Sequence, residues 1–109
     1  MIVRLSSTVV PDSQLNVYKE HVLGTEITRY EAAPGLVSVW VLQRTFVAYV
    51  ELLVISLWNS AHALALFEEI EPPRDQVKAH CSAIRLEAGA YELVLFREGG
   101  ARDGGAGSY

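Results

Sequence analysis

The sequence has few of the features that mark several large classes of protein. It contains one cysteine, Cys81, among 109 residues, so no internal disulfide can form and a reducing compartment is expected. Nine Lys and Arg stand against thirteen Asp and Glu, a net charge of −4, and no basic stripe indicates nucleic-acid binding. The longest strongly apolar run, residues 46–58, includes Glu51 and is shorter than the roughly twenty residues that a bilayer span needs.

Targeting signals, repeats and common catalytic motifs are missing as well. The N-terminus lacks the pattern of a secretory leader, in which a charged segment is followed by an apolar stretch and a cleavage site, so no secretory leader is expected. The absence of a nucleophile elbow, a P-loop and a dinucleotide fingerprint removes the hydrolase, NTPase and dehydrogenase interpretations. No set of histidines and carboxylates has metal-ligand spacing, so we expect no metal site. We expect a cytoplasmic, single domain over residues 1–98, with no membrane or nucleic-acid partner, and a flexible glycine-rich tail at 99–109.

What the sequence does contain is an alternation of strand-like and helix-like segments. β-branched residues dominate 2–10 and Pro11 ends that strand. Apolar residues then recur at helical spacing, with a slight offset around Gly24. The expected elements, in order, are a strand at 2–10, a helix from a cap at Asp12 or Ser13 to Pro34, strands at 36–44 and 49–58, a helix from a cap at Asn59 or Ser60 to Pro72, a short helix at 75–82 and a strand at 91–97.

The main elements follow the order β-α-β-β-α-β, which predicts a ferredoxin-like α+β fold with a four-stranded antiparallel sheet. Such a sheet should alternate apolar and polar residues if one face is wet. In the middle strands, both sets of alternating residues are apolar. In strand 49–58, Leu53, Ile55 and Leu57 lie on one face, and Leu52, Val54 and Trp58 lie on the other. Since the helices can cover one face only, we expect a second copy to cover the other. The residues expected in that contact are Val37, Val39, Val41, Leu53, Ile55, Leu57, Leu93 and Leu95.

Two junctions carry a resemblance to a known family. Ala33-Pro34-Gly35-Leu36 leads into one middle strand, and Val54-Ile55-Ser56-Leu57-Trp58-Asn59-Ser60 leads out of the next into a helix. In these junctions and in element order, residues 1–97 resemble the antibiotic biosynthesis monooxygenase (ABM) group of the dimeric α/β-barrel superfamily. The resemblance implies a homodimer with sheets packed face to face, a dimeric α/β barrel, and an apolar pocket in each protomer between sheet and helices.

The resemblance also implies a choice among activities. The leading interpretation is a cofactor-independent monooxygenase of a small aromatic or quinol-like molecule, with no cofactor. Val54 and Leu64 stand where quinone-forming members carry asparagine and tyrosine, so a non-catalytic ligand-binding or structural dimer stays open. A haem-binding or haem-degrading oxygenase is the third interpretation. There Phe67 aligns with a second tryptophan, and His80 lies near the haem-ligating histidine if Pro72-Pro73 belongs to an insertion.

The candidate site residues divide into proton carriers and ligand contacts. The candidate catalytic groups, which could take a proton from an acidic phenol, are His80, Tyr18 and Tyr30. The candidate substrate-binding residues are Trp58, Phe67, Asn59 and Ser7. Each has a plain structural alternative: core packing for the aromatic residues, a helix cap for Asn59, a surface position for His80 and a strand edge for Ser7. If the site is functional, we expect Trp58, Phe67, Tyr18 and Tyr30 to bound it.

Overall fold

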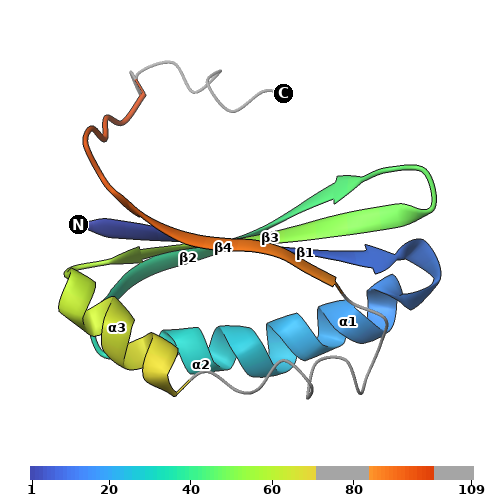
Figure 1. The fold of residues 1–109 in the computed structure, drawn as a ribbon, viewed down its shortest axis with the longest axis horizontal. Coiled ribbons are helices and arrows are strands. Elements are labelled where there is room, and N and C mark those ends of the chain that lie inside the picture. The colour runs from blue at the N-terminus through green and yellow to red at the C-terminus, as the bar shows by residue number, and fades with distance from the viewer. Residues whose placement is uncertain (71–83, 100–109) are drawn as a thin grey trace.

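The structure, a computed structural model, describes residues 1–70 and 84–99. Its strands are β1 (Ile2–Pro11), β2 (Leu36–Thr45), β3 (Tyr49–Trp58) and β4 (Ile84–Glu92). They form one antiparallel sheet in the order β2-β3-β1-β4, and the described helices all lie on one face of it (Figure 1). This is the ferredoxin-like α+β arrangement that the sequence predicted. In the described part of the chain, no helix is long and apolar enough to cross a membrane.

The first helical segment contains a π-turn that aligns its sheet-facing residues. It consists of a 3₁₀ turn (Asp12–Gln14), α1 (Leu15–His21), the π-helical turn η2 (Val22–Glu26) and α2 (Ile27–Glu31). The N–H of Ile27 donates to the carbonyl of Val22, five residues back, so one extra residue is absorbed near Gly24. At about 100° per residue, Tyr18 and Tyr30 would lie about 120° apart on a regular helix. With one residue absorbed they differ by only about 20°, and both are buried against the sheet.

The helix starts differ from each other in how they are capped. The prediction that Asp12 or Ser13 caps the first segment was wrong: no side chain caps it, and the Asp12 N–H instead donates to the Ala48 carbonyl at 3.0 Å. Of the two caps predicted for the second helix, α3 (Ala61–Glu69), the structure selects Ser60. Its Oγ accepts from the Ala63 N–H at 3.1 Å, which satisfies one of the free amides of the first turn.

A bulge in β2 reverses the predicted faces of that strand. Leu36 pairs with Trp58 but Ser38 pairs with Leu57, which leaves Val37 as the extra residue. A bulge shifts the alternation of side chains by one position. The open face of the sheet, the face without helices, therefore carries Trp40 and Leu42, paired with Ile55 and Leu53. The prediction that Val39 and Val41 lie on this open face was wrong, because both pack against the helix-side core.

The last strand lies earlier in the chain than predicted. β4 spans Ile84–Glu92, whereas the sequence favoured 91–97, where the apolar residues are large. Leu93 N–H still donates to the Met1 carbonyl at 2.9 Å, but no strand continues beyond it as far as residue 99. Leu93 and Leu95 therefore follow the sheet instead of belonging to it. The predicted helix at 75–82, His80 and residues 100–109 lie outside the described residues.

Gly35 sets how α3 returns beneath the sheet. Its φ of 89° lies in the region that favours glycine. A Cβ at this position would overlap the Ala63 side chain and approach Asn59 Oδ1 to 3.0 Å. The Asn59 N–H donates to the Gly35 carbonyl at 2.9 Å. This hydrogen bond and the close approach of Ala63 hold the start of α3 against the Pro34-Gly35 turn, at the edge of the core.

Candidate active site

Three aromatic residues converge between the sheet and the helices. Tyr30 from α2, Trp58 from the end of β3 and Phe67 from α3 form what we call the aromatic cluster. The ring centroids lie 4.6 Å apart for Tyr30–Phe67, 4.9 Å for Trp58–Phe67 and 6.4 Å for Tyr30–Trp58, all tilted by 40° to 45°. The Trp58 indole N–H donates to Ser56 Oγ at 2.9 Å, so its polar atom is satisfied inside the core. The sequence predicted that these three residues share a site, and the structure brings them together.

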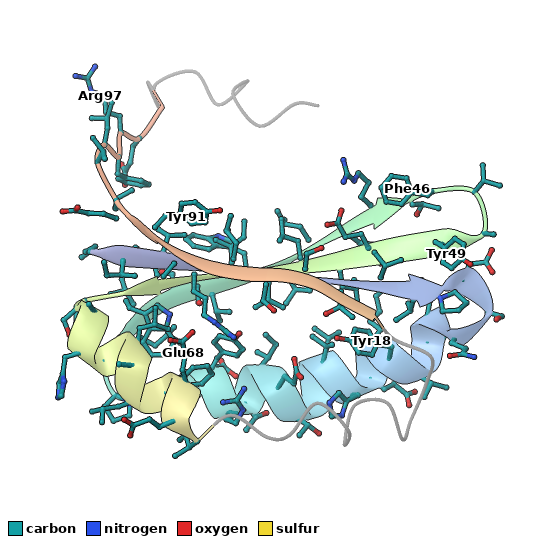
Figure 2. The ribbon with its side chains drawn as sticks, in the orientation of Figure 1. Tyr18, Phe46, Tyr49, Glu68, Tyr91 and Arg97 are labelled. Atoms are coloured by element: carbon teal, nitrogen blue, oxygen red, sulfur yellow. The ribbon has the colours of Figure 1, made fainter. Side chains whose placement is uncertain are left out.

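The other predicted site residues lie elsewhere. Tyr18 is buried beneath the same face of the sheet, but it lies at the α1 end of the helical layer, away from Glu68 and α3 (Figure 2). Asn59 is exposed at the start of α3, with its amide beside Gly35. Ser7 pairs with Leu53 and therefore lies on the open face of the sheet. Trp58 and Phe67 lie on the other side, so Ser7 is separated from the aromatic cluster by the sheet itself.

Ser7 belongs to a polar network on the open face. Its hydroxyl donates to Glu51 Oε2, and Arg44 donates to Glu51 Oε1 from Nε at 3.1 Å and from Nη2 at 2.8 Å. The hydrogen bond from Ser7, followed by the hydrogen bond and charge of Arg44, holds the pKa of the Glu51 carboxyl below its ordinary value, against an opposing effect of burial. Glu51 is therefore ionised at neutral pH. The network links β1, β2 and β3 on the open face and lies outside the helix-facing site.

The helix-facing side of β1 carries polar residues, which the sequence analysis overlooked. Arg4, Ser6 and Thr8 are all buried, and they pair with the core positions Ser56, Val54 and Leu52 of β3. A strand covered by helices normally presents apolar side chains to them. The signal was available in the alternation of residues 3–9, since every second residue from Arg4 to Thr8 is polar. These buried polar side chains lie beside the hydrophobic core on the same face of the sheet.

Arg4 is the charged group at the centre of this side. It is 1% exposed. Its Nη1 donates to the Tyr30 hydroxyl at 2.5 Å, its Nε lies 3.3 Å from Glu68 Oε2, and its Cζ lies 5.9 Å from the centroid of the Phe67 ring. Taking a guanidinium out of water costs several kcal/mol unless it is paired. The fold places this paired charge next to the aromatic cluster, which makes Arg4 the leading candidate for a functional residue that the sequence analysis missed.

A second guanidinium also lies close to the cluster. The Arg29 Cζ is 4.2 Å from the Phe67 ring centroid and 5.7 Å from that of Tyr30. Arginines in this position are attracted to the face of the ring, and Arg4 and Arg29 together place two guanidinium groups near the Phe67 ring. In the described residues, no group of three or more His, Cys, Asp or Glu side chains could hold a metal ion. Aromatic faces can stack on flat rings and guanidinium groups can stabilise negative charge, so these are the residue types that an anionic aromatic molecule would need.

Comparison with known proteins identifies the fold. No protein-family description and no curated protein match the chain. Among solved structures, a Bacillus cereus protein provisionally named an antibiotic biosynthesis monooxygenase is 17% identical, with 89% of this chain and 96% of that chain covered and a TM-score of 0.62. The haem degrader MhuD from Mycobacterium tuberculosis, solved with two haems in its active site, is 17% identical over 90% and 100% of the chains, with a TM-score of 0.61. SnoaB, a cofactor-independent oxygenase from Streptomyces nogalater, is 12% identical over 87% and 95%, with a TM-score of 0.59.

These matches extend over nearly the whole of each chain, so the protein has the ABM-like fold that the two sequence junctions indicated. The fold neighbours differ in their named chemistry, one degrading haem and one using no cofactor. The activity of this chain is therefore argued from its own side chains.

Proposed function

We propose that the protein is a cofactor-independent monooxygenase that acts on a small aromatic, quinol-like molecule on the helix-facing side of its sheet. The observation that carries this proposal is the buried Arg4–Tyr30 hydrogen bond beside Trp58 and Phe67. An electron-rich phenolate needs a flat wall to stack on and a fixed positive charge to stabilise it. Both are present at one place, and the fold is shared with an oxygenase that uses no cofactor.

In the proposed mechanism the substrate supplies the electrons and O₂ is the oxidant. The charge of Arg4 favours the ionised form of a bound phenol. The anion passes one electron to O₂, and the two radicals combine to form a C–O bond. The protonated peroxide then loses water and leaves a carbonyl, so that RH₂ + O₂ gives R=O + H₂O. Tyr30, whose hydroxyl oxygen accepts from Arg4, is the proton carrier within the aromatic cluster. Tyr18 and His80 remain predicted proton carriers.

We also propose that two copies pack through their open faces. Beside the Ser7–Glu51–Arg44 network, the open face presents these large apolar side chains: Val3, Leu5, Val9, Trp40, Leu42, Leu53, Ile55, Leu57 and Tyr91. Trp40, Leu42 and Tyr91 are each about half exposed in a single chain. Soluble monomers rarely show contiguous apolar patches above a few hundred Å². A second copy supplies an identical apolar sheet and leaves the helix-facing site of each protomer accessible.

One observation favours the competing interpretation, a non-catalytic dimer of the same fold. Val54 and Leu64, the positions where quinone-forming oxygenases carry asparagine and tyrosine, are both buried members of the hydrophobic core. They provide no polar atom to a ligand. If the protein is an oxygenase, its proton chemistry must therefore come from other residues, of which Tyr30, hydrogen-bonded to Arg4, is the one in the aromatic cluster.

Oxygen uptake separates the two interpretations. Anthrone is a suitable probe, since its CH₂ group becomes a carbonyl in the proposed reaction. We expect the protein to consume one O₂ per anthraquinone formed. Arg4→Met and Tyr30→Phe are expected to lower the rate about 10- to 100-fold, the range for losing a positioned charge or proton carrier. Arg97→Met, which alters an exposed arginine far from the helices (Figure 2), is the control and should not change it. Anthrone oxidation no faster than without protein rejects the oxygenase.

A further inference from the structure

We propose that the apolar tip, the four residues 46–49 at the turn between β2 and β3, docks on the surface of a lipid bilayer. This surface lies outside the helix-facing site, so docking does not depend on the proposed oxygenase activity. The lack of a segment long enough to span a bilayer led to the expectation of no membrane partner. A shallow contact made by a turn needs no spanning segment.

The apolar tip lacks the residues that normally form a hairpin turn. Its sequence is Phe-Val-Ala-Tyr, whereas such turns favour glycine, asparagine and aspartate. Ala48 nevertheless has a φ of 69°, in the left-handed region that those residues adopt most readily. All four residues are exposed, and a run of exposed apolar residues is unfavourable unless it has a function. The strain and the exposure together indicate that another surface contacts the tip.

The apolar tip is a fixed projection at one end of the molecule. The turn lies at an end of the longest axis (Figure 1), and Figure 2 shows Phe46 and Tyr49 there. The Phe46 N–H donates to the Tyr49 carbonyl at 2.7 Å, and the Asp12 N–H donates to the Ala48 carbonyl at 3.0 Å. Val47 is 95% exposed, and the two aromatic side chains are about half exposed. The turn therefore holds its apolar side chains toward the surroundings.

Polar residues separate the apolar tip from the apolar side chains of the open face. Arg44 pairs with Glu51 across the sheet, and the next open-face pair toward the middle of the strands is Leu42 with Leu53. The Ser7 hydroxyl joins the same polar network. A second copy that packs on the apolar part of the open face meets this network before it reaches the tip. The tip therefore needs a different occupant.

The order of side chains along the projection matches the layers of a bilayer surface. Val47 is the most exposed residue of the tip, Phe46 and Tyr49 flank the turn, and the Arg44 Cζ lies 4.7 Å from the Phe46 ring centroid. Arg44 uses Nε and Nη2 for Glu51, which leaves Nη1 for a lipid phosphate. Aromatic rings and arginine heads are favoured at the level of the headgroups, with aliphatic groups deeper.

A lipid surface fits the tip better than a protein partner does. Four residues cover much less than the roughly 1,200 Å² that a stable protein complex buries in total. The chain carries a net charge of −4, so we expect binding to zwitterionic lipid without a requirement for anionic lipid. Asp12 is exposed and is held beside Ala48 by its backbone, which limits insertion to the tip itself. We therefore expect shallow, reversible binding.

Flotation with phosphatidylcholine vesicles tests the proposal. The parent protein should float with the vesicles in proportion to the lipid concentration. Val47→Asp should lower the partition coefficient by at least about tenfold, because a charge replaces the most exposed apolar group of the tip. Val94→Asp is the matched control, since Val94 is 91% exposed but follows β4 instead of lying in the turn. This variant should bind vesicles as the parent protein does.

Several outcomes overturn the proposal. They are no flotation of the parent protein, unchanged flotation of Val47→Asp, or an equal loss in Val94→Asp. Because Val47 is almost fully exposed, its replacement should not unfold the chain. Sedimentation equilibrium should give the same mass for Val47→Asp as for the parent protein; dissociation of a parent dimer by this change would assign the tip to a contact between copies and reject the lipid surface. Vesicle binding without oxygen uptake supports the tip and rejects the oxygenase, and oxygen uptake without vesicle binding has the opposite meaning.

Discussion

Replacing Ile55 by aspartate is expected to destroy the proposed dimer. Ile55 lies in the middle of the open face, paired across the sheet with Leu5 on β1 and with Trp40 on β2. In a single chain an aspartate at this position keeps part of its hydration, because Ile55 is only half-buried. In a dimer of face-to-face sheets it would be enclosed by apolar side chains from both copies.

The size of the effect follows from the residues on that face. Burying a large apolar side chain completely is worth roughly 1.5–3 kcal/mol, and these side chains are already partly buried, so the two faces together gain on the order of 10–20 kcal/mol. Association costs an estimated 4–15 kcal/mol or so, so the parent dimer is favoured by a moderate margin. An unpaired buried charge costs several kcal/mol, and each dimer would contain two. At 1.4 kcal/mol for each factor of ten, the dissociation constant should rise by at least about a thousandfold.

Sedimentation equilibrium at micromolar concentration measures this directly. The parent protein should sediment at twice the 12.0 kDa chain mass. Ile55→Asp should lose that species and aggregate or unfold, because a free chain still exposes the rest of the apolar face. Leu66→Asp places the same charge at an exposed leucine of α3 and should remain dimeric. A stable, monodisperse 12.0 kDa parent protein, or an Ile55→Asp dimer of unchanged affinity, would refute the face-to-face arrangement.

Three further predictions concern stability. The fold lowers the pKa of the Glu51 carboxyl from 4.5. The hydrogen bonds and ion pair of Glu51 therefore stabilise the protein above pH 4.5, and this contribution is lost as the pH falls through the lowered pKa. In calorimetric scans, Glu51→Gln should lower the melting temperature at pH 7, and the difference from the parent protein should be smaller at pH 3. Gly35→Ala should lower the free energy of unfolding in urea by about 1–3 kcal/mol, because Gly35 has a positive φ and a Cβ there would overlap Ala63. Equal urea midpoints for the two proteins would contradict the close contact between the Pro34-Gly35 turn and α3. Phe67→Ala should cost about 3–5 kcal/mol by leaving a cavity between Tyr30 and Trp58, whereas Leu66→Ala should cost well under 1 kcal/mol or so.

The element order and the aromatic cluster could be predicted because both depend on local patterns. Period-two and period-3.6 spacing of apolar residues defines strands and helices within a short window. Trp58 and Phe67 were grouped because the alternating residues of the strand that include Trp58 and the apolar stripe of the following helix were expected to converge between sheet and helices. Tyr30 was added from its place on the helical stripe. The tertiary contacts then agreed with these local preferences.

The prediction was wrong at two strands. In one, an extra residue shifts the alternation of side chains between the two faces of the sheet; in the other, pairing with a neighbouring strand determines which residues form the strand. The bulge at Val37 is visible only in the register between β2 and β3, and it exchanges Val39 and Val41 for Trp40 and Leu42 on the open face. β4 was placed too late because Ala88, Gly89 and Ala90 have low strand propensity and owe their place to pairing with β1.

Arg4 was missed as a candidate site residue for a different reason. Its polar alternation with Ser6 and Thr8 was present in the sequence, but a buried arginine is rare and its partners come from distant elements. Tyr30 lies 26 residues away along the chain, and Glu68 belongs to the last turn of α3. Only the folded arrangement brings the three together, so the group on which the proposed chemistry depends could not be found from local spacing.

Isotope labelling of the anthrone reaction tests the central claim most directly. Under ¹⁸O₂ in ordinary water, the account predicts anthraquinone with a single ¹⁸O atom, at the carbonyl made from the CH₂ group, and the second ¹⁸O atom in water. The labelled product should form much more slowly with Arg4→Met and with Tyr30→Phe than with the parent protein or Arg97→Met. Labelled product at the same rate from the parent protein and Arg4→Met, or no labelled product above the protein-free reaction, would contradict an oxygenase site at Arg4 and the aromatic cluster.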